Sequence, residues 1–179
     1  MVRRPACRPN TDVVGNSLRD FKIRAAHRAA LIAFAWVLAM NLMTILSPAF
    51  ALRREPMTLF TGQGEKKIAV EITESDMEKA RGLMFRTKLG DDEGMLFFYD
   101  RPQEITMWMR NTYIPLDMVF IKPDGTVQRI VERTEPLSEA IISSVDPVIA
   151  CLELAGGAAQ RLGLKVGDKI GHSLFQTGK

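Results

Sequence analysis

The chain has 179 residues, with 24 basic and 21 acidic side chains and a formal net charge of +3. The first 51 residues hold seven of the basic and two of the acidic side chains, so residues 52–179 hold 17 basic and 19 acidic ones, a net charge of −2. The basic excess therefore belongs to the N-terminal segment, and nucleic-acid binding by the rest of the chain is not indicated.

Residues 1–51 have the pattern of a secretory signal peptide with a long n-region. Basic side chains between Arg19 and Arg28 precede an uncharged apolar run over 29–46, and Ala49-Phe50-Ala51 offers a small-x-small cleavage site. The alternative is a retained anchor, because 18 apolar residues nearly reach the length of a spanning helix. We expect cleavage after Ala51, a periplasmic or secreted location, and a single mature domain over 52–179. The protein would then contact the membrane only through the signal segment, before cleavage.

The mature part shows many short strand patterns and two short helix patterns. A capping box at Ser75–Glu78 opens the first helix, whose core face we expect to hold Met77, Ala80 and Met84. Glycine and proline turns separate the strands, which favours a mainly β, compact single-domain β-barrel or sandwich with two short helices. Strands are predicted at 57–62, 66–73, 94–99, 105–110, 117–122, 126–133, 146–154 and from 167, and the second helix at 155–164.

The segment MWMRNTYIPLDM, residues 107–118, combines methionines with polar side chains. Strand alternation places Met107 and Met109 on one face with Ile105, which indicates a core face. A Cu(I) site built on these sulfurs is a lesser alternative. No zinc site is predicted, because the mature part keeps only Cys151 and His172 as cysteine and histidine.

The opposite face of that segment carries the candidate site. Trp108 and Arg110 share it, and Asn111 and Asp117 flank the following turn, which suits a small polar ligand or an envelope partner. Arg81 and Arg86 are candidates for an added anion site. The alternative is a structural network, in which Arg110 pairs with Asp117 or Glu153 and Asn111 caps the turn.

Five segments then carry a family resemblance: RGLMFR, DDEGMLFFYD, MWMRNTYIPLDMVFI, DGTV and CLELAGGAAQRLGLKVGD occur in this order. The chain resembles the bacterial and archaeal family called domain of unknown function 192, from about residue 58 to 175. The resemblance implies a small, mainly β single domain that is often exported, and it implies no activity.

The favoured function is a non-catalytic periplasmic binding or accessory module for a small polar ligand or envelope partner, without a cofactor. The alternative is a small envelope hydrolase or transferase that uses Asp117 or Glu93 as acid or base.

Overall fold

Residues 52–175, which a computed structural model describes, form nine strands and two short helices, and the predicted mainly β fold is confirmed. Seven strands build one sheet in the order β6-β5-β8-β3-β2-β1-β9, and β4 and β7 form a separate pair. The elements are β1 Arg53–Thr61, β2 Gly64–Thr73, α2 Asp76–Arg81, β3 Glu93–Gln103, β4 Thr106–Met107, β5 Leu116–Ile121, β6 Val127–Val131, β7 Ile142–Ser143, β8 Val148–Ala155, α3 Ala158–Leu162 and β9 Lys169–Gly171.

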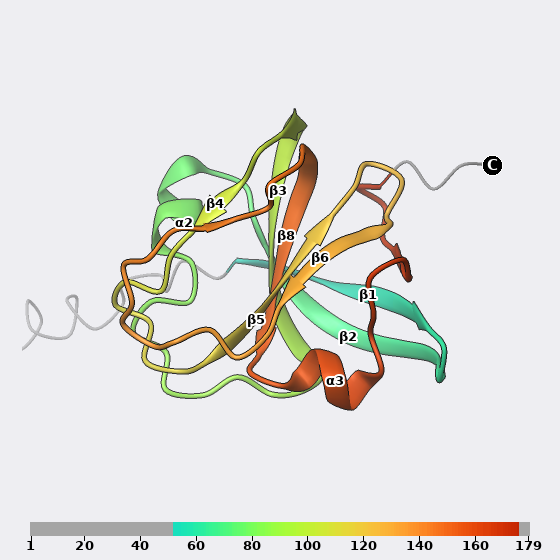
Figure 1. Cartoon of the computed structure of the whole chain (residues 1–179), viewed down its shortest axis with the longest axis horizontal. Helices are drawn as coiled ribbons and strands as arrows, with labels where there is room; N and C mark the ends of the chain where they lie inside the picture. The colour runs from blue at the N-terminus through green and yellow to red at the C-terminus, as the bar shows by residue number, and fades with distance from the viewer. Residues whose placement is uncertain (1–51, 176–179) are drawn as a thin grey trace, which may run out of the picture. The chain divides into compact units, whose positions relative to one another are not determined.

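The large sheet curls into a half-barrel (Figure 1). Its outermost strands meet at a bridge between Thr126 and Lys169, where the Val127 amide donates to the Asp168 carbonyl over 2.9 Å. Gly125 makes this closure possible. Its φ is +79°, and a Cβ there would lie 2.5 Å from the Ile170 carbonyl oxygen.

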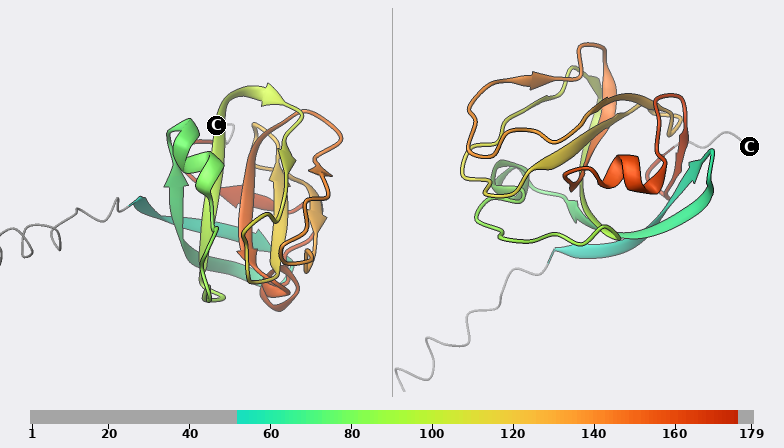
Figure 2. Two further views of the ribbon diagram at one scale, coloured as in Figure 1. Left: turned by 90° about the vertical axis from the view of Figure 1, so that its left-hand side faces the viewer. Right: turned by 60° about the horizontal axis from the view of Figure 1, so that its bottom comes forward.

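Two apolar clusters lie on the two faces of the sheet. The inner one joins residues from β1, β2, β5 and β8 with Ala158 and Ala159 of α3. Figure 2 (right) shows α3 lying across the opening between the β5–β6 and β1–β2 hairpins. The outer cluster packs Met95, Met118 and Cys151 of the central strands under Leu83 and Met109. The segments that cover this outer face form the candidate site.

The capping box of α2 is confirmed: the Ser75 hydroxyl accepts from the Glu78 amide, and the Glu78 carboxylate accepts from the Ser75 amide. The expected core face is wrong, because Met77 is 82% exposed and Ala80 is also exposed. The helix has only six residues and lies on the surface. Leu83, in the turn after it, is the side chain that enters the core.

The predicted strand at 105–110 shrinks to the two residues of β4, which pair with β7, a strand that was not predicted. The predicted alternation still holds along the segment. Ile105 and Met109 are buried, Met107 is half-buried, and Trp108 is 42% exposed.

The predicted signal peptide lies outside the described residues. Residues 52–175 lie within one compact unit. No helix within residues 52–175 is long and apolar enough to cross a membrane.

Candidate functional site

A cleft of about 210 Å³ opens on the outer face of the sheet. The turn after α2 forms one wall, the segment around β4 forms the other, and the central strands form the floor. The polar and aromatic side chains that define its chemistry are Lys79, Arg81, Tyr99, Trp108, Arg110 and Glu153.

Gly82 shapes the first wall. It ends α2 with φ +47°, and a Cβ on it would lie 3.0 Å from the Phe97 ring. A glycine there lets the chain turn tightly over β3, since other residues rarely adopt this backbone conformation. Leu83 is thereby buried, while Arg81 stays exposed at the mouth of the cleft.

The second wall is held by backbone contacts on both sides of Trp108. The Ile105 amide donates to Ser144 Oγ over 3.0 Å, and the Met109 amide donates to the Ser138 carbonyl over 3.0 Å. With Ile105 and Met109 anchored in the core, Trp108 points outward. The Arg110 guanidinium lies 4.4 Å from the centre of its ring, which is a cation–π contact.

Glu153 lies at the floor on β8, a strand paired on both sides. In the strand register it stands between Met95 of β3 and Met118 of β5, so apolar side chains flank its carboxyl group. The residue is only 4% exposed, and its Oε2 atom has no hydrogen-bond partner among the described residues. A buried polar atom without a partner is rare and calls for a physical explanation.

Burial raises the pKa of the Glu153 carboxyl to about 8, and the nearby Arg86 guanidinium offsets part of that rise. The group therefore keeps its proton at neutral pH, because water is not available to solvate the carboxylate. Glu153 thus adds a protonated acid to the residues that line the cleft.

The mouth of the cleft is cationic. Lys79, Arg81 and Arg110 line it, and Glu153 is the single acidic residue among the lining side chains. Lys79 is also placed 5.4 Å from the Tyr99 ring centre. The cleft thus combines three positive charges, three aromatic rings and one protonated acid, a set that suits a small polar ligand with negative charge.

The structure brings three predicted site residues together: Trp108, Arg110 and Arg81 all line this cleft. Two others lie outside the lining. Asn111 turns the chain with φ 57°, and its backbone carbonyl accepts from the Phe85 amide over 2.8 Å. The predicted side-chain cap is not seen, because its Nδ2 contacts the Met84 sulfur at 3.9 Å instead. Arg86 makes two hydrogen bonds to Glu71, one of them 3.0 Å long.

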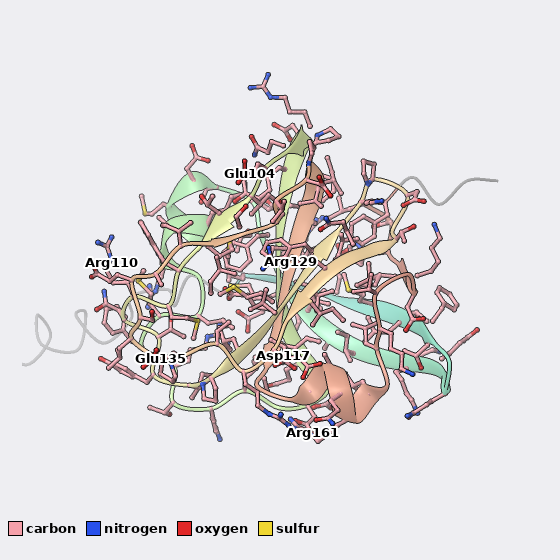
Figure 3. All side chains as sticks on the ribbon, in the orientation of Figure 1. Glu104, Arg110, Asp117, Arg129, Glu135 and Arg161 are labelled. Carbon is pink, nitrogen blue, oxygen red and sulfur yellow. The ribbon has the colours of Figure 1, made fainter. Side chains whose placement is uncertain are left out.

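The predicted placement of Asp117 beside Trp108 is wrong. Asp117 is fully buried, and Figure 3 shows it near α3, away from Arg110. Its Oδ1 accepts from the Arg133 and Gly157 amides, both at 2.8 Å, and its Oδ2 accepts from the Ala159 amide at 2.9 Å. Asp117 therefore joins β5 to the segment after β6 and to the start of α3. The chain after the turn does not run back alongside Arg110, because β5 pairs with β6 and β8.

Glu93 also has local partners. Its carboxylate accepts from the Gly90 amide over 3.1 Å and forms an ion pair with Arg54. The Gly90 amide, followed by Arg54, holds the pKa of Glu93 below its usual value. A group with this environment is ionised at neutral pH and suits a structural pair better than proton donation.

Sequence reasoning did not select Glu153 as a site residue. The available signal was an acid inside the apolar strand VIACLELA. An acid on a strand that is buried on both faces must be neutralised or paired. The pattern alone does not show that β8 is a central strand, so the burial of Glu153 could not be inferred.

The two methionines of the alternative copper hypothesis have separate surroundings. The buried Met109 sulfur accepts from the Thr134 hydroxyl over 3.0 Å, while Met107 lines the cleft. Among residues 52–175, no group of three histidine, cysteine, aspartate or glutamate side chains could hold a metal ion.

Comparisons with known proteins place this geometry in a family. The model of the DUF192 family, described as an uncharacterised ACR family, matches residues 58–172. No curated protein matches the chain.

Two solved bacterial structures are similar to the chain. One is a protein of unknown function from Novosphingobium aromaticivorans DSM 12444, with 42% identity, coverage of 70% of this chain and 89% of that one, and a TM-score of 0.67. The other is described as a "putative transcription regulator" from Sinorhizobium meliloti 1021, with 41% identity, coverage of 68% and 95%, and a TM-score of 0.66.

Proposed function

Because the chain belongs to the DUF192 family, for which the match supplies no activity, we propose a function from the cleft itself: a non-catalytic envelope module that binds a small polar ligand. The observation that carries the proposal is the stack of Arg110 on Trp108 at the mouth of a cleft with two further cations. An aromatic plane beside fixed positive charge recognises a flat, polar molecule through both its face and its charge.

An enzyme is the second candidate, because strongly shifted pKa values gather at catalytic sites and Glu153 has one. The carboxyl group in the cleft is Glu153, whereas Asp117 and Glu93 lie outside it. The lining residues include no second carboxyl and no histidine or cysteine, so they do not assemble an acid–base pair or an activated nucleophile. Binding therefore needs fewer assumptions than catalysis.

A regulator role like that printed for the Sinorhizobium meliloti protein is not favoured for this chain. Residues 52–179 carry a net charge of −2, and binding to the phosphates of DNA relies on a surplus of positive charge.

Export is part of the proposal, and it rests on the order of basic run, apolar run and Ala-x-Ala site in residues 1–51. Cleavage after Ala51 is expected to give a protein that begins at Leu52. Fractionation of expressing cells followed by N-terminal sequencing measures this directly. A full-length chain recovered from the membrane fraction would show a retained anchor instead.

Binding is tested by tryptophan fluorescence of residues 52–179, because Trp108 is the sole tryptophan in that part of the chain. Small organic acids, phosphorylated sugars and neutral sugars form the screen. Arg110→Ala is expected to weaken binding of any compound that changes the Trp108 signal by about tenfold or more, with little change in melting temperature, because Arg110 is exposed.

Arg161→Ala is the matched control. It removes an exposed guanidinium from α3, which Figure 3 shows apart from Arg110, and it should bind as the wild type does. A screen in which no compound alters the Trp108 signal contradicts the proposal. So does an Arg110→Ala variant with unchanged affinity for a compound that does.

A further inference from the structure

The floor of the cleft poses a problem that the binding proposal leaves open. Glu153 is nine-tenths buried and lines the cleft, yet its Oε2 has no partner in residues 52–175. An acid placed for fold stability alone would be expected to find a donor or an opposite charge nearby. Arg86, the nearest candidate by its electrostatic effect, makes its two hydrogen bonds to Glu71 instead.

We propose that the ligand is a small carboxylate, and that protonated Glu153 donates a hydrogen bond to it at the floor of the cleft. This inference rests on the proposed binding function. The ligand would bring a hydrogen-bond partner to the buried Glu153 carboxyl group, which has none in residues 52–175 at Oε2. An O–H···O⁻ hydrogen bond of this kind is short and strong, particularly where water is excluded.

The charges around the cleft favour an anion over a cation. Lys79 and Arg81 approach from α2, and Arg110 from the segment after β4. An ammonium ligand would meet all three of these positive charges before it reached Glu153. A carboxylate would be attracted by the same three charges and would find a hydrogen to accept at the floor.

Among the ionisable groups around Glu153, Glu153 is the one that we expect to change its protonation state near pH 8. On its own strand lies Cys151, whose pKa is raised first by burial, and β3 contributes Tyr99, whose pKa is also raised by burial. The remaining charged neighbours are the Glu71–Arg86 pair and the three cations at the mouth. Loss of the Glu153 proton converts a donor into a second negative charge beside the bound carboxylate. Binding should therefore weaken as pH rises through about 8.

Benzoate, benzamide and benzylammonium are suitable probes, because they share one ring and differ in charge. Calorimetric titration of residues 52–179 from about pH 6 to about pH 9.5 keeps benzoate ionised throughout. Benzoate is expected to bind most tightly of the three. Its dissociation constant should be level at the lower end and rise about tenfold per pH unit once Glu153 has ionised.

Glu153→Gln supplies the matched variant. Glutamine keeps the size and an N–H donor but cannot ionise, so its benzoate affinity should be independent of pH over the same range. At about pH 9 it should bind benzoate roughly tenfold more tightly than the wild type does. The exposed Glu135→Gln variant, a control that removes a carboxylate elsewhere, should keep the wild-type pH profile.

Each outcome decides the inference. Benzoate binding with a level pH profile in the wild type overturns it, as does tighter binding of benzylammonium. Both results would leave the binding function intact if Arg110→Ala still weakened the ligand. If none of the three probes binds, the carboxylate assignment falls. The binding function falls with it only if the wider fluorescence screen is also silent.

Discussion

Replacing Glu153 with glutamine is expected to abolish a loss of stability that the wild type suffers as pH rises from about 5 to about 8. The pKa of the Glu153 carboxyl is about 8 in the folded protein, against a reference value of 4.5. Between these two values the folded protein holds a proton that the unfolded chain has released. The free energy of unfolding therefore falls by about 1.4 kcal/mol per pH unit across the window, or roughly 4–5 kcal/mol in total.

The comparison of wild type and Glu153→Gln isolates this effect from other titrating groups. Burial, the largest cause, lowers the pKa of His172, which gives the opposite slope as pH rises towards its usual value. That contribution is common to both proteins and cancels in the difference. Urea unfolding of both at several values between about pH 5 and pH 9 provides the measurement. Curves that stay parallel would show that Glu153 is ionised in the folded state. Glu135→Gln should follow the wild type.

Asp117→Asn is expected to cost roughly 2–4 kcal/mol of stability. Asparagine keeps one acceptor oxygen for the Arg133 and Gly157 amides but turns an N–H donor towards the Ala159 amide. The Ala159 amide and the asparagine N–H facing it are then both donors without an acceptor, and the charge that strengthened all three bonds is gone. Asp117→Ala, which removes every acceptor, should be more destabilising.

Denaturant unfolding checks this loss, with Asp91→Asn as the control. Asp91 forms an exposed ion pair with Arg161 next to the same helix, so its replacement should change stability by about 0–1 kcal/mol. The folded fraction of Asp117→Asn should bind ligand as the wild type does. If Asp117→Asn were as stable as the wild type but no longer bound ligand, Asp117 would belong to the binding site after all.

The different outcomes for Met109 and Asp117 show what the sequence could predict. Alternation along 105–109 is a local property, so it held even though only two of these residues joined a strand ladder. The position of Asp117 depended on which strand β5 would pair with, and that is decided by contacts distant in sequence. Arg110 was located correctly because it needed only the local pattern.

The periodicity of the sequence failed to predict burial in two opposite ways: Met77 was expected to be buried and is exposed, whereas Glu153 was not expected to be buried and is. Helical spacing put Met77 on a core face, but the helix ends before it can bury one, and Met77 is left exposed. Alternation along β8 places Glu153 on the opposite face from Leu152 and Leu154. It does not show that the face with Glu153 is also buried. Periodicity gives the face of a side chain, and only the packed neighbours decide whether that face meets water.

The pairing of β1 with β9 means that the sheet cannot be completed until the C-terminal end of the chain has been synthesised. Thr58 faces Gly171 across that ladder, 113 positions later, so one edge of the first strand stays open until the last strand has been synthesised. Contacts so far apart in sequence form late and slowly. Until then the nascent chain exposes an unpaired strand edge, the feature through which unfinished β proteins associate with one another. When β9 pairs, it covers that edge over Thr58, Leu59 and Phe60.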